Sequence, residues 1–464
     1  MSRKLHISAR TGLLLALCGF IGSAEDRYVI HTNGNIHQIA KRHGLNVVQS
    51  LTGSGSGHHV LSSSGRNPRE VLRRLAADSD ITTAETDVAV LLPGQRSGAL
   101  VHPAGAPNGQ SLPLDGSMSW YYGSMAANSY LNQTAGQRIN IKGAHDISLG
   151  GTRVAVIDTG IDRTNLVLAA SIGEGWDFVH NQPMGQELAD INQETTPILD
   201  QETTPILDQE TTPILDGGTA LILNQETTPI LDQETTPILD SKNFPAYGHG
   251  TMTSGLIHLV APKATLLPVR SFAADGTSTI SQIVAGIYWA IDHDAQVINM
   301  SFSTQQNSDI LKKAIDDANS KGIICVAAAG NDGRSISVWP AAYEGVIGVG
   351  STNDSDIRSL FSNYGSAVLL AAPGEAVITT YPSTNGGLKQ HYAEVWGTSF
   401  SAPLVAGTAA LLADLNDHIN AGQAARIFTQ SSVSIGNQGL GAGELDAYQA
   451  ALQARKDNGN NHDQ

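Results

Sequence analysis

Short, apolar, largely β-branched runs alternate with stretches of helical periodicity over the C-terminal part of the 464-residue chain. Such runs predict buried strands, and the helical stretches between them favour a parallel sheet covered on both faces. Ligand sites in these sheets lie beyond the carboxyl ends of the strands. The residues that follow each strand are therefore candidates for chemistry. The predicted strands are 153–157, 264–269, 297–300, 322–328, 346–349 and 368–371, and the predicted helices are 281–293 and 309–320.

The segment WGTSFSAPLVAGTA at 396–409 places a hydroxyl between small residues at the start of an apolar helix. Gly397 allows a sharp turn, Thr398 can cap the helix, and Pro403 falls near the first turn, where its missing N–H costs least. The helix N-terminus offers unpaired N–H groups and partial positive charge to a developing oxyanion. Ser399 is thus a candidate nucleophile, although a cap or turn serine looks the same in isolation.

Three further segments supply what a nucleophilic serine needs. Asp158 ends a predicted buried strand, where its carboxylate could accept a hydrogen bond from an imidazole. His249 stands between two glycines ahead of a helix-like run, and Asn331 follows another strand, where its amide could donate to an oxyanion. Taken singly, these residues could be a helix cap, a structural histidine and a turn asparagine. Their shared position at strand ends and helix starts favours a catalytic constellation.

The order Asp158, His249, Ser399 resembles the subtilisin-like serine proteases, the peptidase S8 family, through the motifs VIDTGID, GHGTMTSG, AAAGNDG and GTSFSAP. The resemblance covers residues 120–451 and implies an α/β fold, a doubly wound, seven-stranded parallel sheet with helices on both faces. It also implies a serine endopeptidase that works through an acyl-enzyme. Ser399 would attack the scissile carbonyl, His249 would transfer the proton, and Asp158 would fix the histidine's tautomer. Asn331 and the Ser399 N–H would form the oxyanion hole.

Two other hydrolase classes are excluded. An α/β-hydrolase would need glycine where Ser401 stands, and its acid and base would follow the serine. A zinc protease of the HExxH type has no such motif in this chain. A secreted binding or surface-interaction protein, which would use the acidic repeats described below, remains as the alternative function.

The segment INMSFS at 298–303 matches the family strand that pairs with substrate backbone, which makes Ser301, Phe302 and Ser303 the candidate substrate-binding residues. Ser303 stands where glycine is usual and would narrow the entrance to the specificity pocket. We therefore expect a preference for modest or apolar side chains at the cleavage site. The resemblance implies that the chemistry needs no cofactor. It allows structural calcium, for which no ligands can be assigned in this chain.

The N-terminus has the order of a secretory signal peptide: basic residues, an apolar run at 13–21, and small residues up to Ala24. The run is too short to span a membrane. We expect a secreted, extracellular protein, periplasmic in transit, with no membrane anchor once the signal is removed. Cleavage would also remove Cys18 and leave Cys325 alone, so no internal disulfide is expected.

Residues 25–93 predict a small β-α-β-β-α-β module, with strands at 28–31, 47–51, near Val60 and at 88–92, and helices at 36–43 and 68–77. By resemblance this α+β, ferredoxin-like module is an inhibitory propeptide, so that the protein's own N-terminus is an intramolecular inhibitor. The domain order is then signal peptide 1–24, propeptide 25–93, linker 94–118, peptidase domain 119–455 and polar tail 456–464.

Six octads interrupt the domain at 193–240: GGTALILN at 217–224, and five copies of QETTPILD that start at Gln193, Gln201, Gln209, Gln225 and Gln233. They hold ten acidic and no basic residues, so without them the formal net charge would be −6 instead of −16. Proline in five octads excludes a continuous helix. A solvated loop is the simplest interpretation, with calcium binding or a partner contact as alternatives. The negative net charge argues against nucleic acid as a binding partner. We expect a monomer that acts on polypeptides.

Overall fold

The computed structural model describes residues 26–51, 57–92, 112–113, 117–187, 190, 219–224, 246–382, 392–436 and 438–462. The predicted signal peptide and most of the linker lie outside the described residues. The five consensus octads do as well. Of the insertion, only 219–224, inside the divergent octad, is described.

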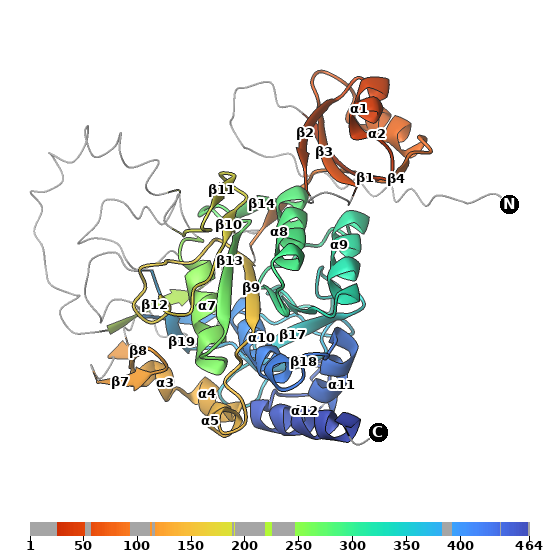
Figure 1. Ribbon diagram of the computed structural model, residues 1–464. Coiled ribbons are helices and arrows are strands. Elements are labelled where there is room, and N and C mark those ends of the chain that lie inside the picture. Colours follow the sequence, from red (N-terminus) through yellow and green to blue (C-terminus); the bar gives the residue numbers. More distant parts are fainter. Residues whose placement is uncertain are drawn as a thin grey trace, which may run out of the picture.

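A central sheet of eight strands organises the larger domain, in the order β11-β10-β13-β9-β15-β16-β17-β18 (Figure 1). Neighbouring strands are parallel throughout, except that β11 joins β10 in the antiparallel sense. This is the parallel sheet that the sequence predicts, with a short antiparallel edge added. The strands are β9 (Arg153–Asp158), β10 (Trp176–Asp177), β11 (Gln182–Pro183), β13 (Thr265–Arg270), β15 (Val297–Met300), β16 (Ile324–Ala328), β17 (Val346–Thr352) and β18 (Leu370–Pro373).

Helices cover both faces of this sheet, and the pleat of β9 shows why. Val154 and Val156 pack into one hydrophobic core with α7 (His249–Val260) and α10 (Thr398–Leu415). Their neighbours Ala155 and Ile157 enter a second core with α8 (Ile280–Asp292) and α9 (Asp309–Ser320). Because β9 is buried on both faces, apolar and polar residues do not alternate along it, and its sequence is a continuous apolar run. The predicted helices at 281–293 and 309–320 are thus confirmed.

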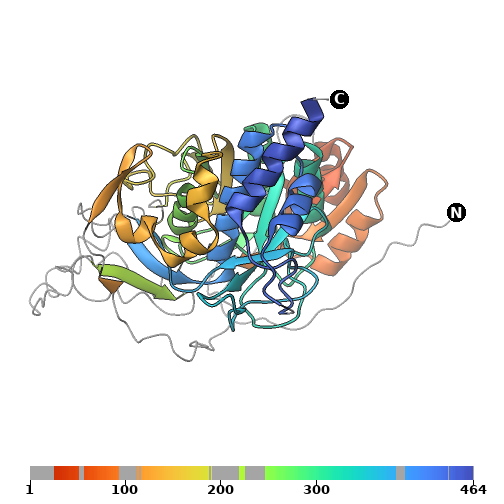
Figure 2. The same cartoon turned by 90° about the horizontal axis from the view of Figure 1, so that it is seen from below.

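Helix α10 runs through the interior of the domain. Among the described residues it is the one helix long and apolar enough to cross a membrane, but 89% of it is buried inside the protein. It is therefore a core helix. Helices α11 (Ala421–Ser431) and α12 (Ala447–His462) pack on its side of the sheet, and Figure 2 shows α12 along this face. Residues 456–462, which the sequence assigns to a polar tail, instead continue α12.

Smaller elements border the sheet. The hairpin of β7 (Met118–Tyr121) and β8 (Ser124–Ala127) and three short helices precede β9: α3 (Asn128–Leu131), α4 (Thr134–Arg138) and α5 (Ile141–His145). A second sheet has the order β19-β20-β12-β6. In it, β12 of the divergent octad runs parallel to β20, the strand that leads into α10. Its strands are β6 (Leu112–Pro113), β12 (Thr219–Asn224), β19 (Val377–Thr380) and β20 (Tyr392–Trp396).

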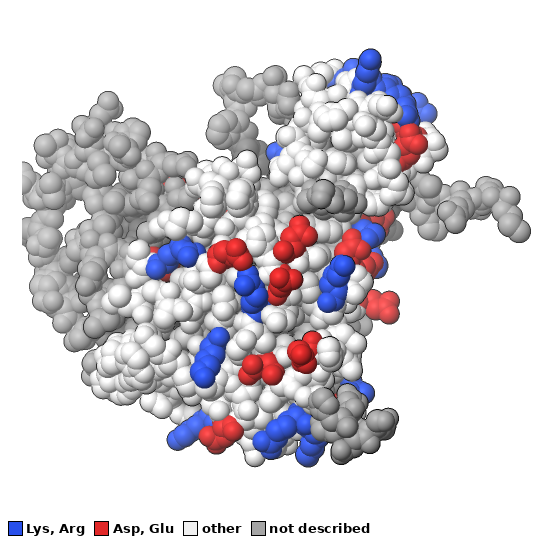
Figure 3. Space-filling view, viewed as in Figure 1, with Lys and Arg blue, Asp and Glu red and all other residues white. Residues whose placement is uncertain are grey.

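The N-terminal unit sits above α8 and α9 (Figure 1) as an antiparallel sheet of order β2-β3-β1-β4 with two helices on one face. It has the ferredoxin-like order expected from the sequence. The elements are β1 (Asp26–Thr32), α1 (Ile36–His43), β2 (Asn46–Ser50), β3 (His58–Ser63), α2 (Pro68–Ala76) and β4 (Ile81–Thr86). Its basic side chains gather on the outer face, over α1 and α2 (Figure 3).

The prediction that 88–92 forms the last strand of this unit is wrong. The fourth strand is β4, whereas β5 (Ala89–Leu91) pairs with β14 (Thr277–Thr279) of the larger domain. The side chains explain the difference, because Val90 and Leu92 are buried in the core formed with α8 and α9. An apolar run shows that a strand is buried without showing which core buries it.

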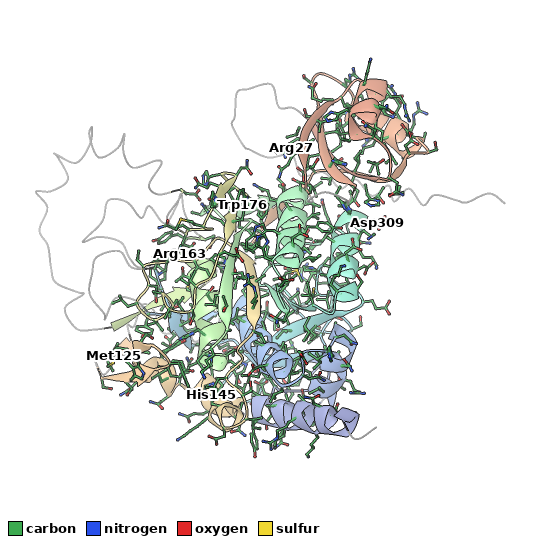
Figure 4. All side chains as sticks on the ribbon, in the orientation of Figure 1. Arg27, Met125, His145, Arg163, Trp176 and Asp309 are labelled. Carbon is green, nitrogen blue, oxygen red and sulfur yellow. The ribbon has the colours of Figure 1, made fainter. Side chains whose placement is uncertain are left out.

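Two acidic side chains fasten the N-terminal unit to the larger domain. Asp87 accepts hydrogen bonds from the Ser281 N–H at 2.9 Å and hydroxyl at 2.8 Å, in the first turn of α8. Glu85 accepts from the Ile310 N–H at 3.0 Å, in the first turn of α9. Both carboxyls therefore face the positive ends of helix dipoles. Figure 4 labels Arg27 and Asp309 on the two sides of this junction.

Candidate active site

Close backbone packing brings the predicted acid and base together. A Cβ added at Gly250, directly after His249, would lie 2.0 Å from the Gly160 carbonyl oxygen, and Gly160 has a φ of +106°. Glycine is needed at both positions, one for contact and one for conformation. The start of α7 consequently lies against the loop that follows β9. His249 Nδ1 is then 2.7 Å from Asp158 Oδ1.

Asp158 is held as a fixed acceptor. Its carboxylate also accepts from the Thr159 N–H at 2.8 Å and the Thr253 hydroxyl at 3.2 Å. The side chains of Asp158 and His249 are almost fully buried. Because an ionised carboxylate only accepts hydrogen bonds, the proton of a neutral His249 lies on Nδ1, and Nε2 can act as a base.

Ser399 lies in the first turn of α10, where a proline reshapes the local hydrogen bonding. Pro403 is four residues further on and cannot donate to the Ser399 carbonyl as a helical residue would. The Ser301 hydroxyl donates to that carbonyl instead, at 2.8 Å. In return, the Ser399 hydroxyl donates to the Ser301 carbonyl at 2.9 Å. The end of β15 and the start of α10 are therefore joined in both directions.

Two local expectations for α10 are wrong. Thr398 makes no capping bond, because its hydroxyl donates to Asn331 Oδ1 at 2.8 Å and accepts from the Gly330 N–H at 3.1 Å. Pro403 lies inside the helix, beyond the first turn. The residue before the helix is Gly397, whose φ of 141° supplies the sharp turn.

Asn331 is tied to the same helix start. Its side-chain oxygen accepts from the Thr398 N–H at 2.9 Å as well as from the Thr398 hydroxyl. Both contacts use the amide oxygen, whereas an oxyanion hole requires the amide nitrogen. The contacts therefore fix the orientation of the amide beside Ser399.

The base lies in the same corner as the nucleophile. The His249 ring packs against the ring of Phe400, the residue next to Ser399, with 5.5 Å between the ring centroids. Helices α7 and α10 pack against each other. The four predicted residues thus gather at the carboxyl edge of the sheet, around the first turns of these two helices.

The predicted substrate-binding residues differ in what they expose. Ser301 contacts Ser399 as described above. The Phe302 side chain is fully buried, with its ring centroid 5.1 Å from that of Phe272, so only its backbone can serve a substrate. Ser303 Oγ lies 3.1 Å from where a Cβ on Gly330 would be. Ser303 therefore faces the loop that carries Asn331.

Sequence reasoning missed one buried carboxyl at this site. Glu187 lies in the loop after β11, is fully buried, and accepts hydrogen bonds from the first turn of α7. Burial raises the pKa of Glu187 to about 7, and the charge of Asp158 adds to the effect. A single glutamate in a polar loop carries no local signal that would have identified it.

The described residues present no group of three or more His, Cys, Asp or Glu side chains that could hold a metal ion. Beside the loop before the insertion, the buried arginine at the end of β13 lies between two carboxylates. Arg270 donates to Asp177 at 3.1 Å and to Asp190 at 2.5 Å. A guanidinium thus neutralises this pair of acids. Cys325 is a free, buried thiol whose pKa is raised by burial to about 12.

Comparison with known proteins decides the family. The model of the subtilase family, Peptidase S8, matches residues 150–462. The chain belongs to the subtilase family. As a subtilase it is a serine-type endopeptidase, which agrees with the function expected from its motifs. No comparison supports the alternative of a binding protein.

Among similar subtilases, thermitase of Thermoactinomyces vulgaris is 31% identical over 325 residues, 68% of this chain and 94% of thermitase. Subtilisin BL of Lederbergia lenta is 36% identical over 213 residues, 44% of this chain and 77% of that protein. The crystal structure of a lanthipeptide protease has the same fold, with a TM-score of 0.52, 23% identity and coverage of 70% of this chain and 94% of that one.

Proposed function

We propose that this subtilase hydrolyses polypeptides through a triad of Asp158, His249 and Ser399, with an acyl-enzyme intermediate. The observation that carries the proposal is the 2.7 Å bond between His249 Nδ1 and Asp158, in the corner where α10 presents Ser399. No cofactor enters this scheme. Chemistry of this kind requires only that the hydroxyl proton has an acceptor and the oxyanion has donors.

The steps follow from the groups present. Ser399 Oγ leaves its bond to the Ser301 carbonyl and attacks the scissile carbonyl carbon, while His249 Nε2 takes its proton. Asp158 stabilises the imidazolium through Nδ1. The Asn331 amide and the Ser399 N–H stabilise the tetrahedral oxyanion. The imidazolium then protonates the leaving amine, and water repeats the sequence to release the acyl group.

The purified protein tests this function directly. Cleavage of fluorogenic peptides, stopped by one equivalent of a sulfonyl fluoride serine reagent, would support it. An activity that resists the reagent but is stopped by a chelator would contradict it.

We also propose that residues 25–93 are an inhibitory propeptide, released by cleavage beyond Leu92. The β5–β14 pairing and the contacts of Asp87 and Glu85 support a specific complex with the peptidase domain. We further propose that the protein is secreted through the segment 1–24 and acts as a monomer.

A buried histidine at this junction predicts release of the propeptide by acid. The His58 ring is fully buried, 5.1 Å from the Tyr288 ring of α8, and neither ring nitrogen has a hydrogen-bond partner. Burial, with His31 and Lys313 nearby, lowers the pKa of His58 to about 3. In the released unit this pKa would return to about 6.5. The complex is therefore fully stable above about pH 6.5 and weakens as the pH falls from 6.5 towards 3.

At pH 5 these two pKa values correspond to affinity about 30-fold weaker than at pH 8. The measurement is the fraction of cleaved N-terminal unit that co-elutes with the peptidase domain at each pH. His58→Gln should flatten this dependence, whereas His37→Gln, at an exposed position on α1, should leave it unchanged. A flat profile in the natural protein would contradict the expectation.

Ser303→Gly should widen the specificity of the enzyme. Removing the side chain that faces Gly330 enlarges the pocket entrance by about one methylene and one hydroxyl. Such a difference changes discrimination by about tenfold or more. We expect kcat/KM for phenylalanine relative to alanine at the cleavage site to rise about tenfold in a peptide library. Ser355→Gly, in an exposed turn, is the control. A natural preference for basic residues would refute the pocket assignment.

A further inference from the structure

Glu187 accepts hydrogen bonds from the start of α7 on both sides of His249. Its Oε1 accepts from the Gly248 N–H at 2.9 Å, and its Oε2 accepts from the Thr251 N–H and hydroxyl, both at 3.2 Å. The side chain is fully buried and belongs to the loop between β11 and the octad insertion. One carboxyl thus holds the residue before the base and the residue two positions after it.

Helix α7 has no cap of its own. Its N-cap residue is Gly248, with a φ of 86°, and its first turn contains no acidic residue. The N–H groups of a first turn have no partners within the helix, and a negative charge is favourable beside them. Glu187 supplies, from a distant loop, both the acceptor and the negative charge that an Asp cap would provide.

Thr159 extends these hydrogen bonds to the backbone of Gly250. Its hydroxyl accepts from the Gly250 N–H at 2.9 Å, and its side chain is also hydrogen-bonded to Glu187. The Thr159 N–H donates to Asp158. Glu187 therefore holds the backbone of Gly248 and Thr251 directly, and that of Gly250 through the Thr159 hydroxyl. The same network reaches the acid that orients His249.

We propose, on the basis of the proposed triad, that Glu187 is a positioning residue for the general base, holding the backbone around His249 so that its imidazole stays aligned with Asp158. Glu187 lies six residues before the first octad. The residue that holds the base is therefore close in sequence to the start of the insertion.

The charge of Glu187 matters for this role. The ionised carboxylate can accept a hydrogen bond from each of its donors. A protonated carboxyl carries an O–H on one oxygen and accepts fewer hydrogen bonds from the surrounding N–H groups. Burial raises the pKa of Glu187 to about 7, so its charge is lost over a range in which activity is measured. The titratable or charged groups that interact with it are Asp158, Arg270, Tyr247 and Tyr381, and His249 is hydrogen-bonded to Asp158.

The decisive variant is Glu187→Gln, which keeps the shape but turns an amide NH₂ towards an N–H donor. We expect kcat to fall by about 10- to 100-fold, as small displacements of a catalytic group do, with KM within about twofold. On the acid side of the pH profile, the fall of kcat/KM should correspond to the binding of nearly two protons in the natural enzyme. In Glu187→Gln it should correspond to one. A structural role alone would lower Tm without changing this slope.

Glu444→Gln is the matched control. Glu444 is also buried, its pKa is also raised by burial to about 7, and it accepts from the Thr352 hydroxyl, away from α7. This variant should keep kcat and the two-proton limb, whatever happens to its Tm. A one-proton limb in Glu444→Gln would overturn the proposal.

Glu187→Asp provides a second variant if the glutamine variant does not fold. It should lower kcat because the side chain is shorter, yet keep the two-proton limb because it still ionises. A natural kcat and slope in every folded Glu187 variant would overturn the proposal. Labelling of Ser399 in the natural enzyme separates this result from failure of the triad itself, in which no label would appear.

Discussion

Ser399→Ala should reduce peptide hydrolysis by about 10⁶-fold, the loss known for removal of the nucleophile in subtilisin, itself a member of this family. The Ala variant lacks the hydroxyl that would form the proposed acyl-enzyme, while the proposed oxyanion hole and substrate contacts remain. The fold should survive, because the Ser399 carbonyl keeps its bond from Ser301. KM should change little. The measurement is kcat on fluorogenic peptides.

The same variant should keep the N-terminal unit attached, because cleavage beyond Leu92 would require the missing nucleophile. Intact mass after expression reports this. Ser401→Ala, two residues further along the same helix, is the matched control and should cleave peptides and process itself. Persistent hydrolysis by Ser399→Ala, with a trace of natural enzyme excluded, would contradict the assignment.

Asp158→Asn should reduce kcat by about 10⁴-fold, the loss found when the acid of a serine protease triad becomes an amide. The 2.7 Å contact with His249 Nδ1 requires an acceptor, and an amide can present its NH₂ there instead. The imidazole would then carry its proton on Nε2 and could not accept one from Ser399. Stopped or long-time assays of kcat measure the loss.

Asp146→Asn, at an exposed carboxylate after α5, should behave as the natural enzyme. Combining Asp158→Asn with Ser399→Ala should cost no more than Ser399→Ala alone, because members of one catalytic unit are not additive. Additive losses in the double variant would show that Asp158 acts outside the triad.

Much of the fold was predictable because buried parallel strands and amphipathic helices leave strong patterns. The helix at 309–320 and the strand at 297–300 have the predicted bounds. The gathering of the four candidate site residues was predictable because the strand ends and helix starts of such a sheet meet at one edge. Periodicity reports local burial, and the strands and helices depend on little else, whereas the site residues were identified from their motifs.

The rest depended on partners distant in sequence. The run at 88–92 is apolar, but its partner strand β14 lies in the other domain. Thr398 has the chemistry of a cap, yet Asn331 takes its hydroxyl. Glu187 caps α7 from a loop 61 positions away. Such contacts are set by tertiary packing, and no local window of sequence contains both partners.

The divergent octad is the one part of the insertion for which the structure revises the simple loop interpretation. It replaces the proline and both acidic residues of the consensus, and it pairs with β20 as a strand. Proline lacks the N–H that a ladder requires, so this copy is better suited to pairing than the others. The consensus octads lie outside the described residues, and their role stays a prediction.

The central claim is that Ser399 is the one serine activated in this chain. Its most direct test is to treat the processed enzyme with a sulfonyl fluoride and locate the adduct by peptide mass mapping. We predict a single adduct, on the peptide that carries Ser399, which is absent from both Ser399→Ala and Asp158→Asn under the same brief exposure. A full loss of activity with the adduct on any other serine would contradict the account.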